Sequence, residues 1–379
     1  MTNNNNIFKP FSVSLFLFFA SLFISSAIYA YDPDNKSTEK QAVGAAKESA
    51  SEDKKFNAGE LIINHITDSH EWHVMGEGEH AIALPLPVII YSSETGLTAF
   101  LSNKLEDGEV YKGFKLIKND IVVVDGDGQL DEKASAKLWD FSITKNVASL
   151  MVSIFLMLWM FLSVAKAYAR NPGKAPKGMQ SLLEPLIIFV RDDIAKSSIG
   201  EKKYKRYLPF LLTVFFFIWI NNLMGLIPFL PGGANVTGNI AIGLTLAVIV
   251  FVITVISANK NYWRHIIAMP GVPIGVLVLL TPIEIFGMFL KPFVLMIRLF
   301  ANMLAGHIIA LSFFSLIFIF AEMNTAVGWG VSIFSVAFTI FMGMLELLVA
   351  FLQAYVFTLL AAMYFGTAVE EHHHAEEHH

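Results

Sequence analysis

KPFVLMIRLFANMLAGH, at residues 291–307, places one arginine, Arg298, in the middle of a long apolar run. A guanidinium stays charged at any ordinary pH, and inserting it at the centre of a membrane helix costs roughly 3 kcal/mol. A chain that carries such a residue pairs it with another group, exposes it to water or uses it to act on an ion. The stretch therefore predicts a membrane helix, and the rest of the sequence decides between these uses.

The composition around this stretch is that of a membrane protein. Hydrophobic residues make up 55% of the 379 residues and charged residues 16%, against about a quarter in soluble domains. The sequence contains no cysteine, which excludes disulfides and thiolate chemistry. Between residues 208 and 367 the charged residues are Lys260, Arg264, Glu284, Lys291, Arg298, Glu322 and Glu346. Lys260 and Arg264 fall in an evident loop, so the other five are the candidates for chemistry.

The N-terminal part is typical of an exported region. Residues 1–30 have the layout of a signal peptide, with cleavage expected after Ala30 or Ala27; an uncleaved anchor is the alternative. Residues 31–55 predict a polar linker, and residues 56–140 predict a small exported soluble region. Strand-like runs at 81–91 and 121–124 give that region strand character.

Five apolar stretches predict membrane helices, at residues 147–165, 207–230, 239–258, 266–320 and 331–365. The loop after the first stretch is strongly basic, which places it in the cytoplasm and agrees with an exported N-terminal region. Residues 182–194 in this loop predict an interfacial helix.

The last two stretches are unusually long. Each could hold a helix of roughly 35 residues or more, over about 50 Å, against a hydrocarbon thickness near 30 Å. We therefore expect a long, tilted C-terminal hairpin, with a kink at Pro282 or Pro292 and a loop that includes Glu322, Gly328 and Gly330. The predicted fold is an all-α membrane protein of about five membrane helices over residues 141–369, with a cytoplasmic tail at 370–379.

Charged side chains of the first long helix share one face. Glu284, Lys291 and Arg298 follow one another at seven-residue steps, and Asn302 lies one turn further on. Ala305 and Ile309 continue this face with small or apolar atoms, which lets another helix approach closely. An ion pair between Glu284 and Lys291 near a membrane interface is an alternative reading of that pair.

A second polar set lies beside the arginine face. His307 is about half a turn away from Arg298 and is expected to face the other long helix, which carries Glu346 and Gln353 seven residues apart. Imidazole titrates near pH 6.5, so His307 is suited to passing protons. Purely structural hydrogen bonding is the alternative for this polar set.

At these residues the sequence resembles subunit a of the F-type ATP synthase. RLFANMLAGH at 298–307 is similar to the family pattern R-L-F-x-N-M-x-A-G, and NNLMGLIP at 221–228 resembles the family segment N-L-x-x-L-x-P. Glu284, Lys291 and Gln353 also fall at the family's spacings, and the likeness covers roughly residues 140–368. His307 and Glu346 are exchanged relative to many bacterial members, as in mitochondrial members, which suggests that the two positions cooperate.

The resemblance implies a proton-translocating stator subunit in the cell inner membrane that carries out no ATP chemistry itself. It implies that Arg298 stabilises ionised acids of the rotating c-ring, while His307, Glu346 and Gln353 belong to the external half-channel. Glu284 would line a half-channel and Asn302 would support Arg298. The implied partners are the c-ring, the stator b subunits, other ATP synthase subunits and membrane lipid, with no nucleic acid, cofactor or metal. An ion-coupled secondary transporter is the alternative function.

Two weaker signals remain. Histidines 65, 70, 73 and 80 and the His-rich tail are expected to be solvated, with metal binding as the alternative. Residues 125–131 are expected to form a turn and not a calcium loop, because the sixth position lacks glycine and the twelfth lacks an acid.

Overall fold

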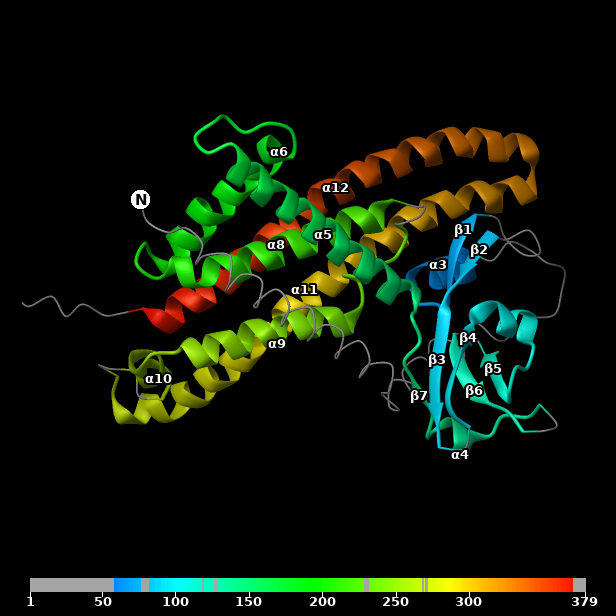
Figure 1. Ribbon diagram of the computed structural model, residues 1–379, viewed down its shortest axis with the longest axis horizontal. Helices are drawn as coiled ribbons and strands as arrows, with labels where there is room; N and C mark the ends of the chain where they lie inside the picture. Colours follow the sequence, from blue (N-terminus) through cyan, green and yellow to red (C-terminus); the bar gives the residue numbers. More distant parts are fainter. Residues whose placement is uncertain are drawn as a thin grey trace, which may run out of the picture.

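The computed structural model describes residues 58–370, except 76–81, 94, 118, 126–127, 228–231, 268, 270 and 271. A body of long helices runs along the molecule, and a small group of strands lies at one end of it (Figure 1). The predicted signal peptide, the predicted linker and almost all of the predicted tail lie outside the described residues.

The N-terminal region is built from short antiparallel strands, which confirms its strand character. Its elements are α3 (Ala58–Ile66), β1 (Glu71–Met75), β2 (Ile82–Pro85), β3 (Pro87–Ser92), β4 (Gly96–Leu101), η4 (Ser102–Gly108), β5 (Phe114–Ile117), β6 (Asp120–Val123), α4 (Glu132–Ser135) and β7 (Trp139–Asp140). The strands form the pairs β1–β2 and β5–β6 and a three-stranded sheet in the order β4-β3-β7. Val88 and Ile90 on alternate positions of β3 pack with Leu105 and Phe114 in a small core of their own.

Five helices are long and apolar enough to cross a membrane, which confirms the predicted fold class: α5 (Lys145–Arg170), α8 (Tyr204–Leu226), α9 (Ile240–Ser257), α11 (Ile274–Met323) and α12 (Thr325–Val369). The predicted second span is too long, because α8 ends at Leu226. The predicted start of the fourth is too early, because a separate helix, α10 (Lys260–Ile267), precedes α11.

Helix α8 lies at the centre of the helical body. Phe215, Phe216 and Phe217 are fully buried, so this helix is covered on every side, as expected of a helix that is hydrophobic all round. The ring of Phe161 from α5 meets Phe216 edge-on at 4.9 Å between centroids, and Phe351 from α12 meets Phe215 at 5.8 Å. The neighbouring helices are therefore packed against one aromatic core.

The C-terminal hairpin is long, as predicted, but its helices exceed 35 residues and its turn is shorter than predicted. Helices α11 and α12 contain 50 and 45 residues, which correspond to about 75 and 68 Å. Only Asn324 separates them, and its side chain accepts a hydrogen bond from the N–H of Ala326. The predicted loop is therefore wrong, since Glu322 lies in the last turn of α11 and both glycines lie in α12. A Cβ on Gly328 would come within 2.7 Å of the Cα of Ala321, so the helices need glycine there to turn so tightly.

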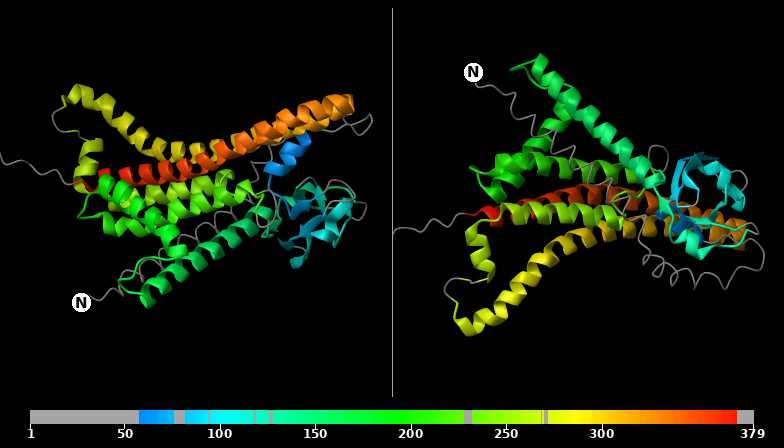
Figure 2. Two further views of the ribbon diagram at one scale, coloured as in Figure 1. Left: turned by 90° about the horizontal axis from the view of Figure 1, so that it is seen from above. Right: turned by 60° about the horizontal axis from the view of Figure 1, so that its bottom comes forward.

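Both prolines of α11 lie inside a continuous helix. Figure 2 shows α11 bending in its yellow first half, which contains Pro282 and Pro292. The predicted kink is therefore confirmed, because proline removes a backbone hydrogen bond and crowds the preceding turn.

The basic loop after α5 folds into α6 (Met179–Phe189), the π-helical segment η5 (Val190–Lys196) and α7 (Ser197–Ile199). Val190 and Ile194 are fully buried on one side of η5. On its other side Asp192 pairs with Arg191 at 2.6 Å and with Lys196 at 2.8 Å. The hydrogen bonds from Arg191 and then Lys196 lower the pKa of Asp192. The predicted helix at 182–194 is thus two-faced as expected, and longer.

Candidate functional site

Arg298 is exposed on the surface of α11. Lys291, Asn302, Ala305 and Ile309 are exposed with it, which confirms that these positions share a face that the rest of the chain leaves uncovered. Other exposed residues of the same helix segment are apolar, among them Phe293, Val294 and Ile297. The guanidinium is therefore a cation on a largely apolar stretch of helix surface, with Lys291 two turns away. Glu284 departs from the pattern, because it is half-buried.

His307 and Glu346 line the same hollow between α11 and α12. His307 therefore faces the other long helix, as predicted. The other lining residues of the hollow are Leu226, Asn302, Met303, Gly306 and Val349. His307 is 9% exposed and Glu346 is half-buried. A Cβ on Gly306 would lie 2.9 Å from Oε1 of Glu346, so the glycine gives the carboxylate room to lie against α11.

Asn302 connects the hollow to the arginine face. Asn302 is exposed, as is Arg298, which comes one helical turn earlier in the chain. Asn302 also lines the hollow beside His307. An amide both donates and accepts hydrogen bonds, so it can hold a charged group or water on either side. The structure therefore brings together three predicted residues, Asn302, His307 and Glu346, with Arg298 one turn away.

Gln353 belongs to a separate buried network. Its side-chain amide donates to the backbone carbonyl of Leu299 at 2.7 Å, and its Oε1 accepts from Asn222 at 3.4 Å. The hydroxyl of Thr237 then donates to Oδ1 of Asn222 at 2.6 Å. The network ties α11, α12, α8 and the loop after α8 together. Sequence reasoning did not assign Asn222 or Thr237 to the site, although adjacent asparagines in an apolar span were a usable signal.

The loop after α8 lies against His307. A Cβ on Gly225, near the end of α8, would lie 3.7 Å from Nε2 of His307 and 3.6 Å from the backbone carbonyl oxygen of Ala234. It would also lie 3.1 Å from the terminal methyl of Met303. Glycine at this position therefore lets α8, α11 and the loop meet at the imidazole.

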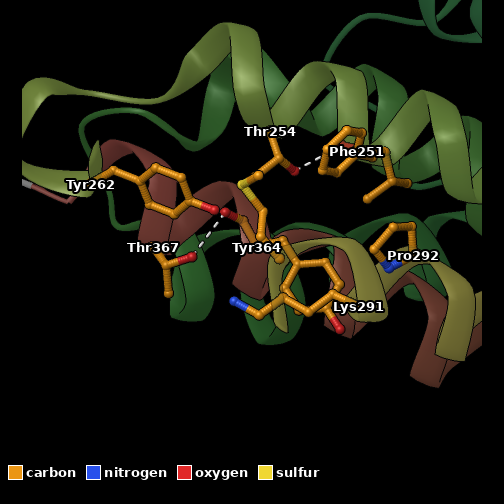
Figure 3. Close-up of a pocket in the computed structure, with 9 residues that line it drawn as sticks. Phe251, Thr254, Tyr262, Lys291, Pro292, Tyr364 and Thr367 are labelled. Carbon is orange, nitrogen blue, oxygen red and sulfur yellow. Dashed lines mark hydrogen bonds between the residues drawn. The ribbon is translucent and has the colours of Figure 1, made fainter. Parts of the chain in front are cut away.

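A second hollow lies where α9, α10, α11 and α12 meet (Figure 3). The ammonium of Lys291 lies 5.5 Å from the ring centroid of Tyr364, within range of a cation–π contact. Thr254 and Thr367 donate their hydroxyls to backbone carbonyls of their own helices, at 2.7 and 3.0 Å. None of the six predicted site residues lines this hollow.

Glu284 lies near this second hollow without pairing with Lys291. Among the ion pairs of the described residues, no Glu284–Lys291 pair occurs, which removes that alternative. Burial and then the charge of Glu284 raise the pKa of Tyr262 on α10. Glu284 therefore stands apart from His307, Glu346 and Gln353.

The expectation for the N-terminal histidines is wrong for His70, the one whose side chain is described. His70 is 7% exposed, and its Nε2 lies 3.3 Å from Oδ2 of Asp140. The side chains of histidines 65, 73 and 80 lie outside the described residues, as does the His-rich tail. Over the described parts of the chain, no three His, Asp or Glu side chains gather as metal ligands would. The predicted turn at 125–131 is confirmed, since Asp125 accepts from the N–H of Gln129 at 2.8 Å.

Two protein families match the sequence. The family described as ATP synthase A chain matches residues 147–366, and a domain of unknown function matches residues 61–141. The second match covers most of the strand-containing N-terminal region.

Similar proteins carry the name ATP synthase subunit a. One from Chloroherpeton thalassium is 41% identical over 247 residues, covering 64% of this chain and 71% of that protein. One from Myxococcus xanthus is 40% identical over 249 residues, covering 63% of this chain and 77% of that protein. The family match contains Arg298 and spans more than half of the sequence. This chain therefore belongs to the ATP synthase A chain family.

Proposed function

We propose that this chain is the proton-translocating stator subunit of the membrane sector of an F-type ATP synthase. In this role it forms two half-channels against the c-ring and couples proton flow to rotation. The observation that carries the proposal is the position of Arg298, a permanent cation on an uncovered apolar helix face, one turn from the hollow that holds His307 and Glu346. Such a face suits a partner that brings negative charge into a membrane.

The role of Arg298 follows from electrostatics. A carboxyl group crosses lipid in its protonated, neutral form, because a lone carboxylate in a low dielectric is strongly disfavoured. Opposite Arg298 the same group is stabilised as a carboxylate and releases its proton. The guanidinium also repels a proton that would move directly between the two half-channels. Each elementary charge that crosses gains about 2.3 kcal/mol per 100 mV of membrane potential.

His307 and Glu346 are proposed as the proton-carrying pair of the external half-channel. Both line one hollow, Asn302 extends it to the arginine face, and the amide of Gln353 fixes the two helices beside it. Glu284 acts by its charge on Tyr262, which lines the other hollow, so we assign Glu284 to the opposite half-channel. Sites on the two sides of Arg298 are what two half-channels require.

The proposed topology places the N-terminal region outside the inner membrane and the C-terminus in the cytoplasm. Residues 1–30 would be the signal peptide, 31–55 a linker, 56–140 the exported domain and 141–369 the translocating domain, followed by the tail. The proposed partners are the c-ring, the stator b subunits, other ATP synthase subunits and lipid. The uncovered apolar faces of α5 and α11 offer surface for them.

The test compares two cations of the same helix face. Arg298→Ala in the native complex should abolish proton-driven ATP synthesis while the complex still assembles. Lys291→Ala removes the neighbouring positive charge, seven residues away, and should leave synthesis near the wild-type rate. The measurement is the rate of ATP synthesis in vesicles under an imposed proton gradient. A wild-type rate in Arg298→Ala would overturn the proposal. Proton-coupled transport by the purified chain without a ring would favour a secondary transporter.

A further inference from the structure

The N-terminal domain, residues 58–140, is fixed to the membrane helices by hydrogen bonds and by packing. The carboxylate of Asp68 accepts a hydrogen bond from the backbone N–H of Asn146, in the first turn of α5, at 3.0 Å. The indole N–H of Trp72 donates to the backbone carbonyl of Gly232 at 3.1 Å, in a buried position. Helix α3 also packs against α11 (Figure 1). The domain is therefore held at several points and not only by the chain connection.

Only a short loop separates this domain from His307. Gly232, the partner of Trp72, is two residues before Ala234, whose carbonyl oxygen lies against Gly225 beside the imidazole of His307. Residues 234–237 of this loop are all buried. The face of the N-terminal domain that carries Trp72 therefore covers the loop that in turn covers the proposed proton site.

Buried polar atoms gather in the segments that meet here. Of the buried side-chain atoms that make no hydrogen bond within the described part of the chain, five belong to these segments: Nδ1 of His70, Oδ1 of Asn146, Oγ of Ser149, Oδ1 of Asn221 and Nδ2 of Asn235. Buried polar groups are nearly always hydrogen-bonded, to protein or to ordered water. Unsatisfied polar atoms on the segments that join the N-terminal domain to the membrane site are the environment that a water-filled route requires.

Helix packing places Ser149 at the level of the loop. Helices α5 and α8 run in opposite directions along the molecule and touch at Phe161 and Phe216 (Figure 1). Ser149 precedes Phe161 by about three turns, and α8 ends about three turns after Phe216. The buried side of α5 with Asn146 and Ser149 therefore lies near the end of α8 and the loop that follows, with Asn221 about one and a half turns before that end.

The N-terminal domain carries a titratable pair, His70 and Asp140. His70 lies just before β1 and pairs with Asp140 on β7. The other charged groups near it are Asp68 and Asp120, and Lys145 of α5 is near Asp68. Burial opposes the imidazolium, but the hydrogen bond and charge of Asp140, with the other two acids, outweigh it and raise the pKa of His70. The neighbouring acids therefore favour the protonated imidazole, which makes the pair a site that can bind a proton.

We propose that the N-terminal domain forms the outer wall of the proton route to His307, with the His70–Asp140 pair as its first proton-binding station. A proton from outside binds the imidazole of His70 and passes on through water held by Asn146, Ser149 and Asn235. The inference rests on the proposed function, because it extends the external half-channel into the domain of unknown function.

The first test measures water access with thiols. The chain has no cysteine, so Ser149→Cys and Leu150→Cys each introduce a single thiol into it. Both positions are buried, at 0% and 1% exposed, in the same turn of α5. In vesicles carrying the native complex, silver ion added on the N-terminal side should react with the Ser149→Cys thiol at least about ten times faster than with the Leu150→Cys thiol, because thiolates react only where they are solvated. The reacted fraction is counted by mass after denaturation and alkylation. Equal, slow reaction of both thiols would overturn the proposal.

The second test measures proton flow through the membrane sector after the catalytic sector is stripped off. His70→Gln should lower the flux roughly 3–10-fold at an outer pH of about 8, where protons are scarce, and less than about twofold near pH 6. His265→Gln changes an exposed histidine on α10 and should leave the flux unchanged. A structural role for His70 would instead lower the flux equally at both pH values, and this result, or no loss at all, would overturn the station.

Trp72→Phe keeps the aromatic packing and removes the hydrogen bond to Gly232, so it tests the wall without the station. It should leave the pH dependence of the flux unchanged and increase the reaction of silver ion with the Ser149→Cys thiol. The two levels of the proposal fail separately. If Arg298→Ala uncouples the complex while His70→Gln and His265→Gln give the same proton flux, the inference is wrong and the proposed function stands.

Discussion

Gly306 makes a quantitative prediction about the hollow between α11 and α12. In Gly306→Ala the new Cβ would lie 2.9 Å from Oε1 of Glu346 and 3.4 Å from its Cδ and Cγ, where ordinary contacts lie at 3.4–4 Å. The carboxylate must therefore move by about half an ångström or turn out of the hollow, and such overpacking costs roughly 1–3 kcal/mol. If the displaced carboxylate no longer passes protons to His307, that cost falls on the transport step and slows it about tenfold to a hundredfold.

The assay is ATP-driven proton pumping in vesicles, with ATP hydrolysis by the detached catalytic sector as the assembly control. Gly330→Ala is the matched control, because it adds the same methyl group to the same hairpin at a position with no atom within 4 Å. It should pump at the wild-type rate, and its helix propensity improves by about 1 kcal/mol. Wild-type pumping in Gly306→Ala, at normal assembly, would refute the assignment of Glu346 to the proton path.

Three further predictions concern other parts of the molecule. Exchanging the pair in His307→Glu with Glu346→His should impair proton pumping less than either single change, with a coupling of roughly 1–3 kcal/mol in a double-mutant cycle; additive losses would argue against cooperation. Gln353→Leu removes a buried hydrogen bond to the neighbouring helix and should lower the free energy of unfolding by roughly 1–3 kcal/mol. The measurement is the thermal midpoint of the complex, which should fall; an unchanged midpoint would show that the network is dispensable. Because the pKa of His70 is raised by folding, its contribution to stability is complete at low pH and is lost as the pH rises through the pKa of folded His70. Because the pKa of Asp140 is lowered by folding, its contribution is lost as the pH falls through the pKa of folded Asp140. Hydrogen exchange of residues 87–92 should therefore be slowest, after correction for its intrinsic pH dependence, in the mildly acidic range between the two pKa values, and in His70→Gln the acceleration with rising pH should disappear.

The membrane helices could be predicted because hydropathy and length constrain them independently of their neighbours. Their ends could not. The turn at Asn324 replaces a predicted loop, because the close approach of Gly328 to Ala321 is a tertiary contact that makes a one-residue connection possible. Glycines and a glutamate in sequence look like a loop until the partner helix is known.

The arginine face could be predicted because seven-residue spacing places side chains on one side of a helix whatever surrounds it. The network around Gln353 was only half predictable, since Asn222 is 131 residues from Gln353 and 15 from Thr237. The pairing of His70 was not predictable at all, because its partner Asp140 is 70 residues away and both lie in a polar region where solvated side chains are the usual outcome.

The most direct measurement is the structure of the assembled membrane sector. It should place the guanidinium of Arg298 beside the acidic side chains of the ring, about 4–6 Å from the nearest carboxylate, as stabilisation of its ionised form requires. The Asn302 side of α11 should line the same boundary. Finding Arg298 against lipid or against another stator chain, with the ring's acids facing some other surface, would contradict the account.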